Sequence, residues 1–517
     1  MRVRGGGYLL LSVIVSAWSV LVAGRHAWTG DWHLHVATVR ALAHHPLAPE
    51  DPLVGGQVGS PYFTPYTLLL ALVSRMTGLT PEAVLSCAGV ANAGLLLWGL
   101  RVFCRRLGDR TATAVLAVVF VLLLWGTRPF AWSGFPPMAS LSFTQPYPST
   151  LALALMPPCW AFMLRFREEG RPSDLVRLAV LAALILLVHP FTAAETAFVA
   201  AAFLLARPRA WTRGRLIALA CAGIGALALA ALWPYAELSA LARAGSGFSR
   251  IHSTLVANAF GKYWLVLVGI PALWFGRRLP LGRELAVGFA AGTAVVTVAV
   301  LLGRYEFTRL IPVVALMSQF AVARCLGDRL AGWRPYGAVA ATACVAGLFG
   351  AAPGIARALP PGVPADLVPA RVTEHWPGGR IDHRAEFARP YVRDGDVVMA
   401  RRAAATRTLV GWGVRAVAPP YPYPFVADET ARRTAQRRMF ARATPPDERL
   451  ALADRYGVRC LLGRRPPEVP GFVPVAASGR ETLLCRPRVA RARAGIFTPS
   501  VTPLWRAGSP YSVGGSG

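Results

Sequence analysis

The sequence predicts a mainly α-helical, polytopic membrane protein of about eleven spans, with a small extracytoplasmic α/β domain near its C-terminal end. Of its 517 residues, 54% are hydrophobic and 16% charged, and the mean hydropathy is +0.44, values that soluble globular domains rarely reach. Beyond about residue 360 the chain becomes rich in Arg and Pro. We therefore predict a transmembrane module over 1–358 with its first extracytoplasmic loop over 25–80, an α/β domain over 359–490 and a flexible tail over 491–517.

Eleven apolar runs approach the roughly 17 to 25 residues that a membrane-spanning helix requires. They lie near residues 8–24, 81–103, 111–127, 149–165, 175–189, 190–206, 215–235, 259–275, 283–302, 309–325 and 335–357. The basic start, Met1 to Arg4, followed by an apolar run also has the features of a signal peptide. Ten further apolar runs favour a first span that is retained.

The distribution of arginine predicts the orientation of the spans. A further apolar run extends from Pro61 to Met76. Whether this run crosses the membrane decides on which side of the membrane every later loop lies. If this run does not cross the membrane, five short basic loops fall on the same side as the basic N-terminus, which is the positive-inside pattern of cytoplasmic loops. These loops carry Arg101, Arg105, Arg106 and Arg110; Arg165, Arg167 and Arg171; Arg207, Arg209, Arg213 and Arg215; Arg277, Arg278 and Arg283; and Arg324, Arg329 and Arg334. We therefore predict a cell-membrane protein with a cytoplasmic N-terminus, an extracytoplasmic C-terminal domain, and a juxtamembrane helix over Pro61 to Met76.

The polar C-terminal part alternates short apolar runs with helical patterns. Strands are predicted at 396–400, 414–418, 458–462 and 482–485, and helices at 428–443 and 446–456. This alternation is typical of a small α/β domain. Cys460 and Cys485 lie in this part and would pair if it faces an oxidising compartment, although spacing alone does not fix their geometry. The other six cysteines fall in or beside apolar runs, without metal-binding spacing.

Charge and motifs exclude several classes of function. Lys and Arg outnumber Asp and Glu by 55 to 26, an excess that suggests nucleic acid binding in a soluble protein. Membrane topology accounts for much of the excess here, so no nucleic acid partner is predicted. The sequence has no Walker A pattern, no G-x-G-x-x-G that opens a helix after a strand, and no H-E-x-x-H, which removes the usual support for ATP-driven transport and zinc proteolysis.

The most informative stretch is the loop after the first span. It begins with Trp28-Thr29-Gly30-Asp31-Trp32-His33-Leu34-His35 and continues through Glu50-Asp51-Pro52 to Ser60-Pro61-Tyr62-Phe63-Thr64-Pro65-Tyr66. An acidic residue just beyond a span, followed by helix-forming residues and a second acidic pair, indicates a site at the membrane surface. The other unusual polar residues also collect on the predicted outer face.

These features resemble the GT-C glycosyltransferases, membrane enzymes that take a sugar from a polyprenyl-phosphate carrier. The likeness covers most of the chain: an acidic residue after span one, a helical loop with His and an acidic-Pro pair, a juxtamembrane stretch, many spans and an extracytoplasmic C-terminal domain. It implies transfer to a cell-envelope glycan, lipid or protein acceptor. Many relatives carry two adjacent acidic residues in the first loop, whereas Asp31 lies between Gly30 and Trp32. Donor, acceptor and metal dependence therefore stay open.

The resemblance makes Asp31 the candidate general base, because transfer requires a carboxylate to take the proton of an acceptor hydroxyl. The alternative is that Asp31 caps a helix beginning at Trp32. His33 and His35 lie two residues apart and so face different sides of a helix, which disfavours joint metal binding. Either could contact substrate or be solvated. Glu50 or Asp51 could hold the acceptor, or start a turn before Pro52; a divalent cation, if one binds, would use Asp31 and Asp51.

A lipid phosphate leaving group calls for a cation near the outer interface. Arg304 and Arg309 flank the start of the tenth span, and the guanidinium fork matches phosphate geometry. Contact with anionic lipid headgroups is the alternative. Glu306 could pair with either arginine.

Further candidate substrate-binding residues lie at the outer ends of spans. They are Tyr62, Gln145, Tyr147, His189, Glu195 and Glu237. Glu195 is the most telling, because an ionisable group among apolar neighbours at membrane depth usually faces a cavity or a partner. The segment Arg128 to Ser149 is rich in proline and aromatic residues, so we predict that it is not helical. It would form part of the acceptor groove, a lid or a plain external loop.

Two other functions remain open from the sequence. A transporter or lipid flippase would show paired interrupted helices in two related halves, and no internal repeat is evident. A catalytically silent member of the family, acting in envelope assembly, is the other alternative.

Overall fold

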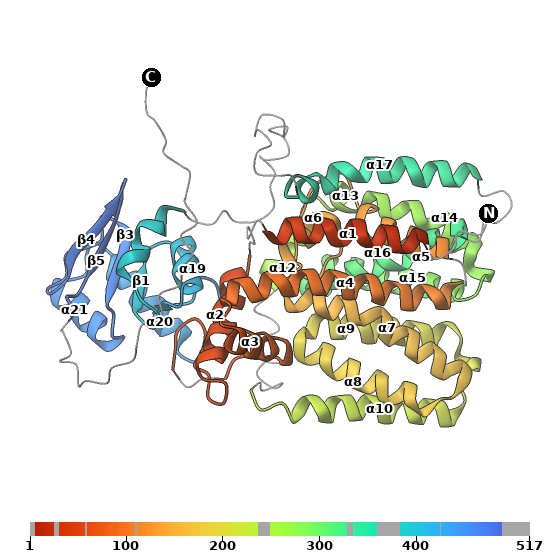
Figure 1. The fold of residues 1–517 in the computed structure, drawn as a ribbon, viewed down its shortest axis with the longest axis horizontal. Coiled ribbons are helices and arrows are strands. Elements are labelled where there is room, and N and C mark those ends of the chain that lie inside the picture. The colour runs from red at the N-terminus through yellow and green to blue at the C-terminus, as the bar shows by residue number, and fades with distance from the viewer. Residues whose placement is uncertain are drawn as a thin grey trace, which may run out of the picture.

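The protein, described from a computed structural model, is a bundle of long helices with a small mixed α/β region at one end (Figure 1). The structure describes residues 6–24, 30–56, 59–108, 111–235, 249–327, 334–358, 383–423 and 425–488. The predicted tail, Trp28 and Glu237 lie outside these residues. The mainly α-helical architecture with a C-terminal sheet is confirmed.

Eight described helical segments are long and apolar enough to cross a membrane. They are Gly6–Gly24 (α1), Pro81–Leu107 (α4), Pro148–Glu169 (α7), Arg213–Ala231 (α10), Ala259–Arg278 (α13, η3, α14 and η4), Gly282–Leu301 (α15), Tyr305–Gly327 (η5 and α16) and Pro335–Ala356 within α17, Arg334–Ala356. Three shorter helices, α5 (Thr111–Leu123), α8 (Pro172–Val188) and α9 (Pro190–Ala206), coincide with the remaining predicted spans. The chain is therefore a multi-pass membrane protein.

Proline defines where many of these helices begin. α4, α7, α8 and α9 have Pro81, Pro148, Pro172 and Pro190 in their first turn, where the missing N–H costs nothing and the fixed φ suits a helix. Long helices pack closely where a small residue allows it: a Cβ on Gly99 of α4 would lie 2.1 Å from the Ala154 carbonyl oxygen of α7.

Two short helices lie where the bundle meets the C-terminal region (Figure 1). They are α2, Trp32–His44, and α3, Pro65–Thr77. α3 begins with a capping box, in which the Thr64 hydroxyl accepts from the Thr67 N–H and the Thr67 hydroxyl accepts from the Thr64 N–H. The predicted helix after Pro61 therefore exists. Its depth in the membrane remains a prediction.

The segment between α5 and α7 corrects one expectation. We predicted no helix between Arg128 and Ser149, but Met138–Thr144 forms α6. The prolines bound this helix instead of interrupting it: Pro137 occupies its N-cap position, and Pro146 follows the C-cap residue Gln145. Proline is well tolerated at a helix start, and Pro146 has no backbone N–H with which to continue the helix.

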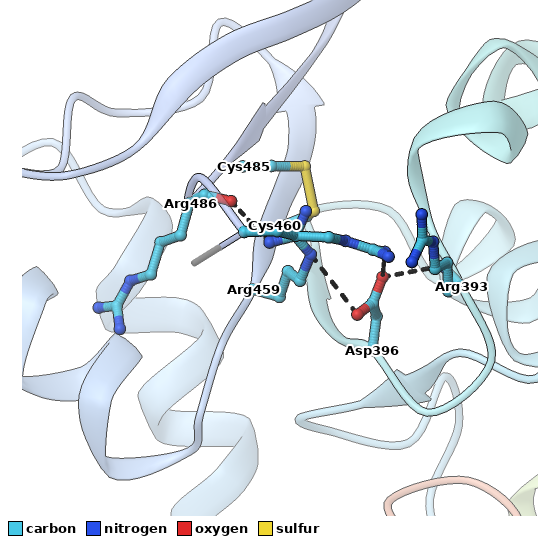
Figure 2. The surroundings of a disulfide bond; sticks show 7 residues. Arg393, Asp396, Arg459, Cys460, Cys485 and Arg486 are labelled. Carbon is cyan, nitrogen blue, oxygen red and sulfur yellow. Dashed lines mark hydrogen bonds and ion pairs between the residues drawn. A yellow bond between two sulfur atoms is a disulfide. The ribbon is translucent and has the colours of Figure 1, made fainter. Parts of the chain in front are cut away.

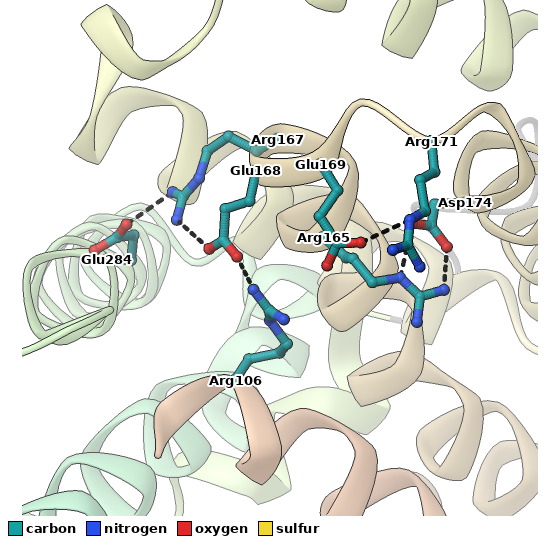
Figure 3. A network of polar contacts seen from close by, with 8 residues as sticks. All are labelled: Arg106, Arg165, Arg167, Glu168, Glu169, Arg171, Asp174 and Glu284. Atoms are coloured by element: carbon teal, nitrogen blue, oxygen red, sulfur yellow. Dashed lines mark hydrogen bonds and ion pairs between the residues drawn. The ribbon is translucent and has the colours of Figure 1, made fainter. Parts of the chain in front are cut away.

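An ionic network ties helix ends together around the α7–α8 turn (Figure 3). Arg167 contacts the buried Glu284 of α15 at 2.8 Å and also Glu168, which pairs with Arg106 of α4. Nearby, Arg165 pairs with Asp174 of α8. The arginines of the predicted basic loops therefore also bind carboxylates from neighbouring helices, which holds the helix ends in place.

The C-terminal region contains a five-stranded sheet in the order β2-β1-β3-β5-β4. Its elements are η7 (His383–Tyr391), β1 (Val397–Ala400), α19 (Ala403–Gly411), β2 (Arg415–Ala416), α20 (Glu429–Phe440), α21 (Pro446–Arg455), β3 (Cys460–Arg464), β4 (Val473–Ser478) and β5 (Glu481–Cys485). β1 pairs in parallel with β2 and β3, whereas β5 pairs antiparallel with β3 and β4. The four predicted strands and both predicted helices are present; β4 and α19 were missed.

Cys460 and Cys485 form a disulfide between directly opposite residues of β3 and β5 (Figure 2). Beside it, Asp396 accepts from the Arg393 N–H at 2.8 Å and contacts Arg459 at 3.5 Å. The disulfide therefore links β3 to β5, and the Asp396–Arg459 contact links the residue before β1 to the residue before β3.

Candidate functional site

Asp31 lies at the N-terminus of α2, immediately after Gly30. Gly30 has a φ of 70°, which favours glycine. Asp31 occupies the N-cap position, but its side chain makes no capping hydrogen bond and is exposed to solvent. The helix-capping alternative is therefore wrong in this structure, and the carboxylate is available for another role.

The next turn of α2 carries His33 and His35, which are both buried. As predicted, they face different neighbours: the His33 ring meets Tyr421 edge-on at 5.9 Å, whereas the His35 ring lies 4.5 Å from Tyr147 and 6.2 Å from Tyr62. The pKa of each histidine is lowered to about 3, mainly by burial. Both rings are therefore neutral near pH 7.

The C-terminal region contributes two residues that the sequence did not reveal, Arg407 of α19 and Tyr421. The guanidinium of Arg407 lies 5.8 Å from the centroid of the Tyr421 ring. α19 packs against α2, where Arg40 donates to the Gly411 carbonyl at 2.8 Å. A signal for Tyr421 was the alternation of proline and tyrosine over 420–424, which is unusual in an Arg-rich segment.

A second polar group surrounds Arg309 of η5, just before α16 of the helical bundle. Arg309 donates to the Ser133 carbonyl at 2.5 Å, contacts His189 Nε2 at 3.3 Å and stacks over Phe191 at 4.9 Å. His189 Nδ1 lies 2.9 Å from the Thr192 hydroxyl at the start of α9.

Two more buried ionisable groups lie within electrostatic reach of Arg309. Glu195 is 0% exposed, and neither carboxylate oxygen has a hydrogen-bond partner among the described residues. His252, on α12 (Ser249–Val256), was not predicted as a site residue; its ring meets Phe191 edge-on at 5.2 Å. The Arg309 guanidinium therefore lies within reach of several side chains that can hold or release a proton.

Asp31 lies within electrostatic reach of both polar groups, that of Arg407 and that of Arg309. Asp31 is exposed, yet enough protein packs around it that loss of hydration raises the pKa of its carboxyl above the usual value. The charges of Arg407 and Arg309 oppose that shift. A carboxyl group with an elevated pKa can accept a proton, and the two guanidinium groups within its electrostatic reach can bind an anion.

Asp51 and Glu50 lie apart from this arrangement. Asp51 is buried; one of its oxygens accepts from the Leu53 and Val54 N–H groups at 2.9 and 3.0 Å, and the other accepts from the Tyr423 hydroxyl at 3.2 Å. This geometry matches the turn-forming alternative. Glu50 pairs with Arg415.

The other candidates have defined positions as well. The Gln145 amide is fully buried against Ser19, accepting from its hydroxyl at 2.9 Å and donating to its carbonyl at 3.1 Å. Arg304 is exposed and pairs with Glu306 at 2.6 Å. Of the predicted residues, the structure therefore gathers Asp31, His33, His35, Tyr62, Tyr147, His189, Glu195 and Arg309, and leaves Glu50, Asp51, Gln145, Arg304 and Glu306 outside the cluster.

The described residues do not provide a metal centre at Asp31 and Asp51. Nowhere in this part of the chain do three His, Cys, Asp or Glu side chains come together in a way that could hold a metal ion. The Asp51 oxygens are already occupied by backbone N–H groups and Tyr423. These residues do not fit a bound cation, so no reaction step is assigned to one.

A cavity of about 310 Å³ lies farther along α2, away from Asp31. Its lining includes His44, Glu50, Asp394 and Arg415. Polar side chains contact each other here: His44 lies 3.2 Å from Asp394, and Arg415 binds Glu50. The cavity therefore lies between the α2 and first-loop residues and the C-terminal region, and Asp31 does not line it.

Comparisons with known proteins place this architecture. A family model described as "6-pyruvoyl-tetrahydropterin synthase related domain; membrane protein" matches residues 61–265, which is less than half of the chain. No curated protein matches by sequence.

Several solved glycosyltransferases have a similar structure. Mycobacterial arabinofuranosyltransferase AftD shares 16% identity at a TM-score of 0.56, covering 93% of this chain and 40% of AftD. ArnT from Cupriavidus metallidurans, solved with undecaprenyl phosphate, shares 14% identity at a TM-score of 0.52, covering 92% and 98%. The Archaeoglobus fulgidus oligosaccharyltransferase, solved with a tethered acceptor peptide, shares 11% identity at a TM-score of 0.50, covering 88% and 69%. The chain spans less than half the length of AftD and nearly all of ArnT. It therefore has the fold of the GT-C glycosyltransferases.

Proposed function

We propose that this protein is a glycosyltransferase that moves a sugar from a polyprenyl-phosphate donor to a hydroxyl of a cell-envelope glycan, lipid or protein. The observation that carries the proposal is Asp31: a carboxylate at a helix N-cap position that makes no capping bond, is open to solvent and has a raised pKa. Its location in the first loop of a GT-C fold supports the same role.

In the proposed reaction, Asp31 takes the proton of the acceptor and Arg309 binds the leaving phosphate. The acceptor oxygen attacks the anomeric carbon of the sugar while its proton passes to the Asp31 carboxylate. The bond from that carbon to the lipid phosphate breaks, and the phosphate leaves with the electron pair, so the anomeric configuration inverts. Arg309 neutralises the departing phosphate, supported by the carbonyl of Ser133 that holds its guanidinium. His33 is a poor base because its pKa is about 3.

The transfer rate should rise with pH as Asp31 loses its proton. Since the pKa of Asp31 is raised, the carboxyl is protonated and inactive below that pKa and becomes able to accept a proton above it. We expect a single ascending limb in kcat/KM, which reports the free enzyme, over a pH range above that in which an ordinary aspartate titrates. Because burial lowers the pKa of His33 and His35 to about 3, neither should add an inflection near 6.5. Steady-state kinetics across this range check the prediction, and a rate that falls with rising pH would contradict it.

We further propose that the site faces the extracytoplasmic side of the cell membrane. The C-terminal region and α2 lie at one end of the bundle, and α1 begins at the other (Figure 1). The basic α7–α8 turn joins helix ends that point away from the site, in agreement with the positive-inside rule. The disulfide in the C-terminal region favours an oxidising compartment.

Cysteine labelling tests this orientation. In a background with the exposed Cys87 and Cys221 replaced by serine, Arg480→Cys at the β4–β5 turn should react with an impermeant maleimide in intact cells. Arg209→Cys in the α9–α10 loop should react only after permeabilisation, because both positions are exposed but on opposite sides. The reverse labelling pattern would refute the orientation.

A further inference from the structure

Three hydrogen-bonding atoms close to Asp31 have no partner among the described residues. They are Nε2 of His33, the hydroxyl of Tyr421 and Nε of Arg407. Each atom is withdrawn from solvent, and leaving such groups unpaired costs free energy. Partners supplied by a ligand would recover that cost, so the cluster is a candidate binding site.

The chemistry of the three atoms is complementary. His33 forms a hydrogen bond with the backbone of Gly30, and its other nitrogen, Nε2, is the one without a partner. The neutral ring therefore donates through Nδ1 to Gly30 and offers a lone pair at Nε2. Burial raises the pKa of Tyr421 well above its usual value, so its hydroxyl stays protonated and can donate or accept. Arg407 Nε can only donate.

The three side chains approach one another from two parts of the chain. His33 belongs to α2, and Arg407 and Tyr421 belong to the C-terminal region. The His33 and Tyr421 rings lie 5.9 Å apart, and the Arg407 guanidinium lies 5.8 Å from the Tyr421 ring. Arg407 is also the strongest charge acting on Asp31. The cluster therefore lies near the candidate base, and two of its three residues come from the C-terminal region.

We infer that the C-terminal region forms the acceptor subsite and that its ligand is an uncharged, hydroxyl-rich saccharide. This inference rests on the proposed function, because it assigns the acceptor to one side of Asp31 and the lipid phosphate to the Arg309 side. The acceptor hydroxyl that loses its proton points to Asp31, while neighbouring hydroxyls bind His33, Tyr421 and Arg407. Because the three atoms are shielded, the saccharide enters as α19 and the chain around Tyr421 move away from α2.

The companions of Arg407 favour a saccharide over an anion. His33 and Tyr421 are neutral, and Tyr62 and Tyr147 contribute further aromatic rings around His35. Aromatic faces and mixed donors and acceptors bind the C–H face and hydroxyls of a sugar ring. The anion-binding role is better met by Arg309, whose guanidinium lies beside His189 and within electrostatic reach of His252.

Binding measurements on the full-length protein in nanodiscs test the inference without a transfer step. The probes are undecaprenyl phosphate and a panel of octyl glycosides carrying mannose, glucose, galactose or arabinofuranose. Losing one neutral hydrogen bond in Tyr421→Phe should weaken binding of a glycoside about 2- to 10-fold, and losing a charged donor in Arg407→Gln about 10- to 100-fold. The affinity for undecaprenyl phosphate should stay within about twofold of wild type in both variants.

Matched controls use exposed residues of the same region. Tyr391→Phe and Arg437→Gln remove the same groups from the surface and should bind every probe as wild type does. If no glycoside binds wild type, if binding is unchanged in both test variants, or if Arg407→Gln weakens undecaprenyl phosphate instead, the inference is overturned. Glycoside binding that depends on Tyr421 in a protein without transfer activity would reject the proposed function and leave the subsite standing.

Discussion

Replacing Asp31 with asparagine should slow sugar transfer by about 10²- to 10⁴-fold, the usual contribution of a general base. Asparagine keeps the size of the side chain but cannot take the acceptor proton. The Asp31 side chain makes no capping hydrogen bond, so the substitution should leave the melting temperature nearly unchanged. The measurement is transfer of radiolabelled sugar from a panel of undecaprenyl-phosphate sugars by the purified protein.

The matched control is Asp447→Asn, which removes the same charge from an exposed position on α21 and should transfer at the wild-type rate. Equal transfer by wild type and Asp31→Asn would remove Asp31 from its role. Absence of transfer by wild type across the panel would favour a transporter, a flippase or a catalytically silent assembly protein.

Replacing Arg309 should produce the second largest effect. Arg309→Gln removes the cation that we place at the leaving phosphate and should lower the transfer rate by about 10²- to 10³-fold, as expected for loss of a preorganised electrostatic contact. Arg309→Lys keeps the charge but loses the planar fork, so its activity should lie between those of wild type and Arg309→Gln. Transfer kinetics and affinity for undecaprenyl phosphate measure both effects.

Neutralising Arg309 also removes the cation within electrostatic reach of the buried Glu195, which destabilises the fold when the Glu195 carboxyl is ionised. The double variant Arg309→Gln/Glu195→Gln restores neutrality, so it separates folding from phosphate binding: it should recover the melting temperature but not the activity. Arg304→Gln is the control, because Arg304 is exposed and pairs with Glu306. If Arg304→Gln reduced transfer more than Arg309→Gln, the assignment of the phosphate cation would be wrong.

Much of the fold could be predicted from the sequence because its signals are local. Apolar runs of the required length and short Arg-rich loops mark the membrane helices, and alternating short runs mark β1, β2, β3 and β5. α6 was missed because proline was taken to exclude helix, whereas here Pro137 and Pro146 only delimit it. β4 was missed because most of its residues are exposed or half-buried, so it lacks a strong apolar pattern.

The candidate site was predictable only in its N-terminal part. Asp31, His33 and His35 follow one another at the start of a helix, so a local pattern contains them. Arg407 and Tyr421 reach the same place only because α19 packs on α2, a contact across more than 370 residues that no local pattern encodes. Asp51 and Gln145 looked like substrate ligands because their residue types suit that role, yet the packed structure supplies their hydrogen-bond partners.

The central claim is that Asp31 and Arg309 face the same phosphosugar at the end of the bundle that meets the C-terminal region. An experimental structure of full-length Asp31→Asn in nanodiscs with undecaprenyl phosphate tests it most directly. The account predicts the phosphate in contact with the Arg309 guanidinium, on the same side of the membrane as residue 31. A phosphate bound at the opposite end of the bundle, beside Arg165 or Arg171, would contradict it.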